Sequence, residues 1–204
     1  MFTPTTYPRL PLFLDLSHSS VLLVGGGRTA QDKLLHLREA GATVHAVALR
    51  FSPDFQEAAH RLGQVILHTK PYEPSDLEGV RLVVSATDIP TVNAQVALDA
   101  KARNLFVNAV DDPPSCDAYF ASQFRRGPWH LAIGTQGGFP GLSRALRETL
   151  DILLPAADAD LLGDLARSRE ALLARLPDPA ARRQALLALV NSFQTTYLNP
   201  EPRP

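Results

Sequence analysis

The sequence predicts an α/β protein whose first half is a doubly wound parallel sheet. Short runs of Val, Leu and Ala alternate with stretches whose apolar residues recur at helical spacing, up to about residue 110. The first of these runs ends in three consecutive glycines. Beyond residue 111 the alternation stops and two polar-apolar runs and an Ala/Leu/Arg-rich stretch follow. Strands that alternate with helices form parallel sheets with helices on both faces, and this is the fold class we expect.

Each element of the first half has its own local signal. Aliphatic or β-branched runs predict strands at residues 21–24, 43–48, 65–67, 82–86 and 105–110. Apolar residues at helical spacing predict helices at residues 29–40, 53–62 and 91–103. Gly41 supplies a stop for the first helix, and Ser52-Pro53 with an acidic first turn opens the second.

A boundary is expected at Asp111, because the run Asp-Asp-Pro-Pro-Ser extends neither a strand nor a helix. Residues 119–124 and 129–134 then read as an antiparallel pair, followed by a helix from Gly137 to about residue 154. The remainder predicts two helices separated at residues 177–179. We therefore expect three regions: 1–112, a small α+β region at 113–154, and a C-terminal helical region at 155–204.

Composition excludes several functional classes. The chain has 204 residues and a formal net charge of -1, and its Lys/Arg runs are short, so neither a nucleic-acid surface nor a polybasic membrane patch is expected. The single cysteine, Cys116, excludes a disulfide framework, and the six scattered histidines predict no permanent metal site. Neither a signal peptide nor a membrane span is predicted, so the expected location is the cytoplasm.

The glycines carry the first functional signal. Gly25, Gly26 and Gly27 follow the first strand, and with Ala30 they fit the pattern G-x-G-x-x-G/A. Gly25 permits the tight turn, Gly27 lets the backbone approach a pyrophosphate, and Ala30 lets the helix pack on the sheet. The helix start at Arg28-Thr29 would hold the phosphate charge. Residues 1–112 are therefore predicted to be a Rossmann-type dinucleotide-binding domain.

The choice of dinucleotide is open at this stage. An NAD enzyme usually places Asp or Glu about 20 residues beyond the glycines. Leu49-Arg50 stands there instead. Arg50 could face an adenosine 2′-phosphate and favour NADP, or it could be a solvated loop residue. Thr87-Asp88, after the fourth strand, could border the pyrophosphate or the nicotinamide ribose, and Asp88 could equally cap the next helix.

Two further groups could act on a substrate. Asp111 and Asp112 follow the fifth strand beside the expected nicotinamide, where one could be a general base or both could serve the turn. Thr135, Gly137 and Gly138 precede a helix and could form a second anion cradle. Four nearby arginines would suit a carboxylate-rich substrate, unless they only cover solvated faces: Arg125, Arg126, Arg144 and Arg147.

At this point the chain resembles a known family, the dehydrogenase/chelatase module of siroheme synthase. The resemblance spans residues 7–175 and rests on motifs in the family's order: Leu10-Pro11-Leu12-Phe13-Leu14, residues 24–30 with Lys33, Ala86-Thr87-Asp88, residues 107–113, Gly127-Pro128, residues 135–140 and Arg144-Ala145-Leu146-Arg147-Glu148. Several ordered motifs make chance similarity improbable. A stand-alone form is expected, because no fused methyltransferase domain follows.

The resemblance implies a specific chemistry. It implies NAD-dependent oxidation of precorrin-2 to sirohydrochlorin, with insertion of substrate Fe²⁺ to give siroheme as an open second step. It makes Asp111 the base, assigns cofactor contacts to residues 25–29, 49–50 and 87–88, and gives the four arginines a tetrapyrrole to bind. It also implies an intertwined homodimer formed through the central region.

Two other functions remain as alternatives. An S-adenosylmethionine-dependent methyltransferase also uses a glycine-rich turn, but normally carries an acidic ribose ligand where Arg50 stands. An NAD-sensing regulatory protein without turnover would leave Asp111 and the Gly137-Gly138 helix start without a role.

Overall fold

The computed structural model describes residues 9–135, 139–154, 156, 163, 167–171 and 174–195. The chain divides into two compact units, which are treated separately below. One holds Pro11–Phe120, and the other holds Ala121–Pro204 together with Met1–Leu10.

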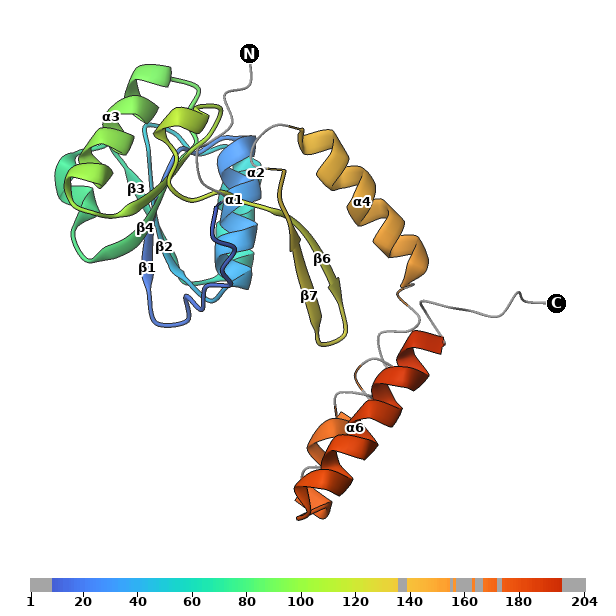
Figure 1. Ribbon diagram of the computed structural model, residues 1–204. Helices are drawn as coiled ribbons and strands as arrows, with labels where there is room; N and C mark the ends of the chain where they lie inside the picture. Colours follow the sequence, from blue (N-terminus) through green and yellow to red (C-terminus); the bar gives the residue numbers. More distant parts are fainter. Residues whose placement is uncertain are drawn as a thin grey trace. The chain divides into compact units, whose positions relative to one another are not determined.

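The unit Pro11–Phe120 is a five-stranded parallel sheet with helices on both faces (Figure 1). Its strands are β1 Ser20–Val24, β2 Thr43–Ala48, β3 Val65–Thr69, β4 Val80–Ser85 and β5 Phe106–Ala109. Its helices are α1 Arg28–Glu39, α2 Pro53–Leu62 and α3 Pro90–Ala102, with short 3₁₀ turns η1 Pro74–Leu77 and η2 Pro113–Ser115. The predicted fold class is confirmed, and the predicted element bounds in this unit agree with the structure to within two residues.

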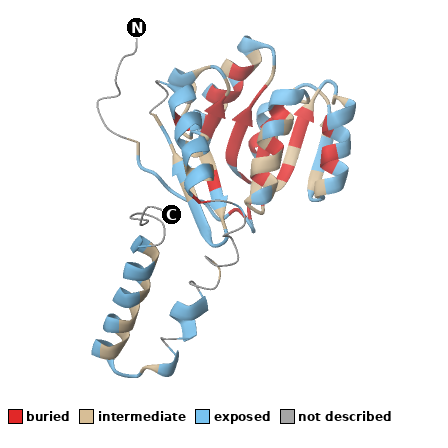
Figure 2. Cartoon of the chain, turned by 90° about the vertical axis from the view of Figure 1, so that its right-hand side faces the viewer, coloured by how far each residue is buried: buried red, intermediate tan, exposed pale blue. Residues whose placement is uncertain are grey.

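Successive side chains of β1 point to opposite faces of the sheet, so the core has two layers. Val21 and Leu23 pack with Leu34 of α1 on one face of the sheet, while Leu22 and Val24 pack with α3 on the other. All four strand residues are at most 2% exposed. Figure 2 shows buried strands in the middle of the sheet and helices that expose their outer faces. Burying each such side chain stabilises the fold by about 1.5–3 kcal/mol, so β1 is anchored from both sides.

The strand order β3-β2-β1-β4-β5 reverses direction at β1. The chain leaves β1 towards β2 and β3, then crosses back to β4 and β5 on the other side. In such sheets the loops beyond the carboxyl ends of the two central strands diverge and leave a crevice, where ligands bind. The topology therefore places the expected site beyond the ends of β1 and β4.

The second unit begins with an antiparallel hairpin, β6 Ser122–Arg126 and β7 Trp129–Ile133. The prediction that the first of these strands starts at residue 119 is wrong. The Tyr119 hydroxyl donates hydrogen bonds to backbone carbonyls of the preceding turn, and Phe120 packs against the α1 side of the first unit's core. Those contacts tie both residues to the first unit, so the hairpin starts later.

Two helices of the second unit are described, α4 Pro140–Leu153 and α6 Pro179–Phe193. Asp178 caps α6 by accepting hydrogen bonds from the backbone N–H groups of Ala180 and Ala181. The other predicted C-terminal helix is described only in part, and its residues 163, 167–171 and 174–175 are helical. No helix in the described part of the chain combines the length and the apolar character that crossing a membrane requires.

Candidate functional site

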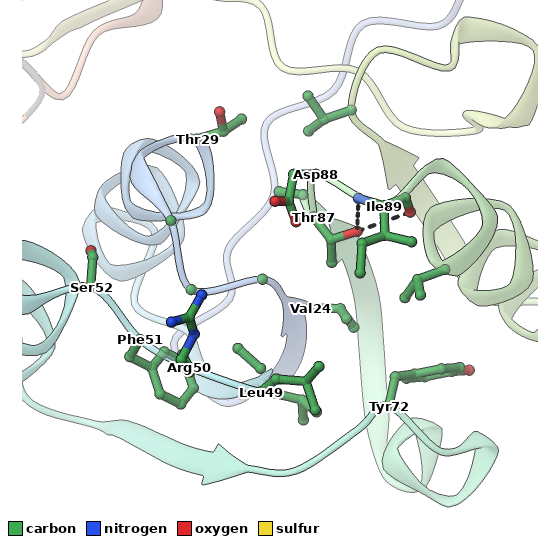
Figure 3. Close-up of a pocket in the computed structure, with 18 of the residues that line it drawn as sticks. Val24, Thr29, Leu49, Arg50, Phe51, Ser52, Tyr72, Thr87, Asp88 and Ile89 are labelled. Carbon is green, nitrogen blue, oxygen red and sulfur yellow. Dashed lines mark hydrogen bonds between the residues drawn. The ribbon is translucent and has the colours of Figure 1, made fainter.

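A cavity of about 1100 Å³ opens at the carboxyl ends of the parallel strands (Figure 3). That volume is large enough for a dinucleotide. Nearly all residues predicted to bind the cofactor line it: Gly25, Gly26, Gly27, Arg28, Thr29, Leu49, Arg50, Thr87 and Asp88. Ala30 does not line the cavity. It is fully buried beneath the glycines, where its small side chain lets α1 approach the sheet.

The first two glycines are held tightly between the neighbouring strands. Gly25 has φ +133°, and a side chain on it would collide with the backbone carbonyl of Ala86. A side chain on Gly26 would collide with the backbone of Arg50. The Gly26 carbonyl accepts a hydrogen bond of 2.8 Å from the Ser52 N–H, which joins the loop to the segment after β2. Only glycine fits at either position.

Gly27 differs because nothing lies within 4 Å of the place a side chain would occupy. It is the N-cap of α1, it makes no side-chain capping hydrogen bond, and the first turn of α1 carries no acidic residue. The first N–H groups of a helix need partners and attract negative charge. The open backbone at Gly27 and these N–H groups therefore fit the pyrophosphate of a dinucleotide.

The segment after β2 forms the next wall of the cavity. Leu49 is 62% exposed and Arg50 is also exposed, while the Phe51 ring packs on Phe55 at 5.2 Å between centroids. Ser52 caps α2, its hydroxyl accepting a 3.2 Å hydrogen bond from the Phe55 N–H. Acidic side chains are absent from the lining contributed by this segment.

The loop after β4 is organised by a residue that the sequence analysis missed, Asn93 of α3. Its buried Oδ1 accepts hydrogen bonds from the Ser85 hydroxyl at 2.6 Å and the Thr87 hydroxyl at 2.8 Å, and its Nδ2 donates to the Thr87 carbonyl at 2.9 Å. The available signal was an amide on the inward, otherwise apolar face of a predicted helix. Asn93 fixes the conformation of the loop at the cavity.

The interpretation of Asp88 as a helix cap is wrong. The N-cap of α3 is Ile89, and its N–H donates to the Thr87 hydroxyl at 3.1 Å (Figure 3). Thr87, and not Asp88, therefore supplies the side-chain hydrogen bond at the start of α3. The Asp88 side chain is exposed and lines the cavity.

Asp111 also lines the cavity, from the loop after β5. Its backbone is left-handed, with φ +62°, which is uncommon for a residue other than glycine. The loop is held by Cys116, whose thiol donates to the Ala109 carbonyl at 3.0 Å and accepts from the Ala109 N–H at 3.2 Å. Burial raises the pKa of the Cys116 thiol, so it remains a neutral donor. Its role here is to shape the turn that carries Asp111.

Lys33 of α1 brings a positive charge towards this loop. Burial lowers the pKa of Lys33, and the charges of Asp32 and Asp111 act in the opposite direction. Its ammonium lies 4.3 Å from the centroid of the Phe120 ring. In the sequence Lys33 stands out only as part of a motif, whereas in the structure the negative charge of Asp111 acts to raise its pKa.

The residues predicted to bind substrate belong to the second unit, where they have protein partners. Arg126 pairs with Asp151 at 2.5 Å, Arg144 with Glu148 at 2.8 Å and Arg147 with Asp151 at 3.2 Å. Arg125 donates to Gln123. The Thr135 hydroxyl accepts a hydrogen bond from the Phe139 N–H, whereas Gly137 and Gly138 lie outside the described residues. The described residues contain no group of three or more His, Cys, Asp or Glu arranged to hold a metal ion.

Comparison with known proteins agrees with this geometry. Residues 12–122, more than half of the chain, match a family model described as "Putative NAD(P)-binding". The chain belongs to this NAD(P)-binding family. The family assignment covers the whole parallel sheet and every strand end that contributes to the cavity.

The predicted resemblance to the siroheme synthase module is also confirmed. The chain is 40% identical over 174 residues to a siroheme synthase of Pseudomonas entomophila (strain L48), covering 85% of this chain and 37% of that protein. It is 41% identical over 175 residues to siroheme synthase 1 of Pectobacterium atrosepticum, covering 86% of this chain and 36% of that protein. The chain thus spans little more than a third of these curated relatives.

A solved structure gives a match along most of both chains. The structure of SirC, precorrin-2 dehydrogenase, superposes with a TM-score of 0.77 and 28% sequence identity, covering 89% of each chain. The similarity to SirC therefore extends past the residues matched by the NAD(P)-binding family model into the second unit.

Proposed function

We propose that the chain catalyses the oxidation of precorrin-2 to sirohydrochlorin with a nicotinamide dinucleotide as oxidant. The observation that carries the proposal is that Asp111 lines the same cavity as the glycine loop, across the point where the strand order reverses. The similarity to SirC, a precorrin-2 dehydrogenase, over 89% of both chains supports this substrate. NAD is the oxidant that the resemblance implies.

The cofactor would be held by the backbone at Gly25–Thr29, by Leu49 and Arg50 on the adenosine side, and by Thr87 and Asp88 near the nicotinamide ribose. A bound oxidised dinucleotide supplies a hydride acceptor. The negative charges of Asp88 and Asp111 on that side of the cavity suit the positive nicotinamide ring.

Asp111 is the proton acceptor in this proposal. The oxidation removes two hydrogens from the macrocycle, one as hydride and one as a proton, and a carboxylate at the cavity can accept the proton. Asn93 and Cys116 act as positioning residues, because one fixes the loop after β4 and the other shapes the loop that carries Asp111.

Replacement of Asp111 by Asn tests this assignment. We expect turnover of precorrin-2, followed as sirohydrochlorin absorbance, to fall by about 10²- to 10⁴-fold, while NAD binding changes less than about threefold. Asp112→Asn is the matched control, since it removes a neighbouring carboxylate. Full turnover by the Asp111→Asn variant would contradict the role of Asp111 as the base.

Insertion of substrate Fe²⁺ is a second candidate activity at the same residue. Metallation removes protons from pyrrole nitrogens, so a carboxylate that accepts protons serves both reactions. Adding Fe²⁺ or Co²⁺ to the enzyme after the oxidation, with spectra recorded after each addition, tests this step. A spectral change on oxidation with none on addition of the metal would show that the protein is a dehydrogenase without chelatase activity.

The second unit supplies two further parts of the proposal. We propose that Arg125, Arg126, Arg144 and Arg147 exchange protein partners for substrate carboxylates. We also propose a homodimer, supported by apolar α4 side chains at helical spacing, Leu142, Leu146 and Leu153, which are 56%, 49% and 55% exposed. Light scattering with Leu146→Glu tests the dimer, and a wild-type monomer would refute it.

The alternatives separate by binding and turnover. A methyltransferase would bind S-adenosylmethionine, which the lack of a carboxylate after β2 disfavours. A sensor would bind NAD without oxidising precorrin-2. Thermal-shift titrations with both ligands, followed by the turnover assay, distinguish these outcomes.

A further inference from the structure

The charged residues that line the cavity are divided by sign along the sheet. Arg28, Arg50 and Lys70 lie at the ends of β1, β2 and β3, whereas the carboxylates, Asp88 and Asp111, follow β4 and β5. Since β1 lies between β2 and β4, the cations occupy one side of the glycine loop and the carboxylates the other. In this fold the adenosine half of a dinucleotide lies towards β2. The adenosine side of the cavity is therefore positive.

The three cations are not equivalent. Lys70 forms ion pairs of 2.8 Å with Glu73 and Asp76, so its charge is already balanced. Arg28 and Arg50 are exposed, and their guanidinium groups have neither an ion pair nor a hydrogen bond with the part of the chain that the structure describes. Two guanidinium groups thus face the cavity with their donors available for a ligand.

The backbone that carries Arg50 is fixed against the glycine loop. The Ser52 N–H donates to the Gly26 carbonyl at 2.8 Å, and the Gln56 side chain donates to the Phe51 carbonyl at 3.0 Å. Figure 3 shows the Arg50 side chain in the wall of the cavity, between Phe51 and Leu49. Only the Arg50 side chain would need to be ordered on binding, which keeps the entropic cost of using it small.

We propose that Arg50, together with Arg28, binds the 2′-phosphate of NADP, and that the cavity binds NADP more tightly than NAD. A carboxylate after β2 would accept a hydrogen bond from the ribose 2′-hydroxyl and repel a phosphate, whereas an arginine pairs with the phosphate. The acid nearest in sequence, Asp54, is exposed in the first turn of α2 and does not line the cavity. The inference rests on the proposed function only for the presence of a dinucleotide in this cavity.

Calorimetric titration of the full chain with NADP, NAD, 2′,5′-ADP and 5′-ADP tests the proposal without any tetrapyrrole. We expect the two ligands that carry a 2′-phosphate to bind at least about tenfold more tightly than their counterparts. Arg50→Ala should weaken NADP binding by about 10- to 100-fold, as expected for loss of charged hydrogen bonds, and should weaken NAD binding by a smaller factor. Arg50→Asp should reverse the preference.

Arg61→Ala is the matched control, because Arg61 is an exposed arginine in the last turn of α2 and does not line the cavity. It makes the same change in net charge and should leave the preference for NADP unaltered. Thermal unfolding of each variant shows that it folds. Equal binding of NADP and NAD by the wild type, or equal losses of both in Arg50→Ala, would overturn the proposal.

Failure of the proposed function would look different. If neither dinucleotide bound, the cofactor site itself would be wrong and this inference with it. If precorrin-2 were oxidised with NAD but NADP bound no more tightly, only the 2′-phosphate assignment would fail. Tight, Arg50-dependent NADP binding without turnover of precorrin-2 would support the assignment and refute the activity.

Discussion

Three consecutive glycines at one turn have three different physical reasons to be glycine. Gly25 adopts φ +133°, and Gly26 lies against the backbone of Arg50, so a side chain on either would force the turn apart. Gly27 has extended backbone and open space beside it, so the fold alone would accept alanine there. Glycine at this position leaves the backbone of residue 27 accessible to a ligand.

This difference predicts opposite behaviour for two similar variants. Gly26→Ala should lower the melting temperature by several degrees, because the segment after β2 must move to admit a methyl group. Gly27→Ala should melt within about 1 °C of the wild type and yet bind NAD or NADP at least about tenfold more weakly. Thermal unfolding and dinucleotide titration of both variants check this prediction. Unimpaired binding by Gly27→Ala would mean that the pyrophosphate lies elsewhere.

At the scale of elements, the second unit depends on a small set of polar contacts between β6 and α4. Arg126 of β6 donates from Nη2 to Asp151 at 2.5 Å and from Nε to the Leu154 carbonyl at 2.6 Å. Its side chain is only 16% exposed, and its guanidinium lies 4.8 Å from the centroid of the Phe124 ring. One residue thus joins the end of a helix to a strand.

Replacing Arg126 by Ala should lower the free energy of unfolding of this unit by about 1–3 kcal/mol, because two hydrogen bonds to a charged group are lost together. Urea unfolding measures the change. Arg125→Ala, at the exposed neighbouring position, is the comparison and should change stability by at most about 0.5 kcal/mol. Equal effects of the two substitutions would show that the Arg126 contacts do not stabilise the unit.

At the scale of the whole molecule, titratable groups outside the main cavity also bear on stability. His45 Nδ1 of β2 and His68 Nε2 of β3 are 3.3 Å apart on the face of the sheet opposite α1. Burial, and secondly the neighbouring His68, lower the pKa of His45. Asp76 and Glu78 line the small cavity beside the pair. The folded state therefore favours neutral His45.

The stability of the protein should consequently fall with acidification. Because the pKa of His45 is lower in the folded than in the unfolded chain, the unfolded state binds more protons just below the ordinary value of about 6.5. The stability that neutral His45 contributes to the folded state is complete above that pH. It is lost as the pH falls through the pKa of His45 in the folded chain. Urea midpoints between pH 7 and pH 5 should decline less steeply for His45→Gln than for the wild type. His60→Gln, exposed on α2, should keep the wild-type slope.

The sequence predicted most of the fold because its signals there are local. Aliphatic runs, Gly41 and Ser52-Pro53 mark elements that the structure places within two residues of the predicted bounds. The start of β6 was mispredicted because Tyr119 and Phe120 have strand-like composition, and their contacts with a turn and with the core outweigh it. Tertiary contacts of this kind leave no mark on local pattern.

The residues of the cavity were predicted from the sequence where their signal is local, and were missed where it is not. Gly25 to Thr29 form a contiguous motif that can be read directly, whereas Asn93 reaches the loop after β4 from one turn inside α3. The effect of the Asp111 charge on the pKa of Lys33 acts between residues far apart in the sequence. The assignments of Asp111 as the base and of the four arginines to the substrate stay predictions, as do the region boundaries at 112 and 154.

The left-handed backbone of Asp111 means that the residue best for stability differs from the residue needed for the proposed reaction. Glycine adopts φ +62° without the crowding that a Cβ brings, so Asp111→Gly should stabilise the protein by about 0.5–1 kcal/mol while removing the proposed base. Any screen that rewards only heat resistance or yield would therefore enrich a chain that lacks the proposed base. If Asp111 is the proposed base, selection for the reaction should retain aspartate here although glycine would give a more stable protein.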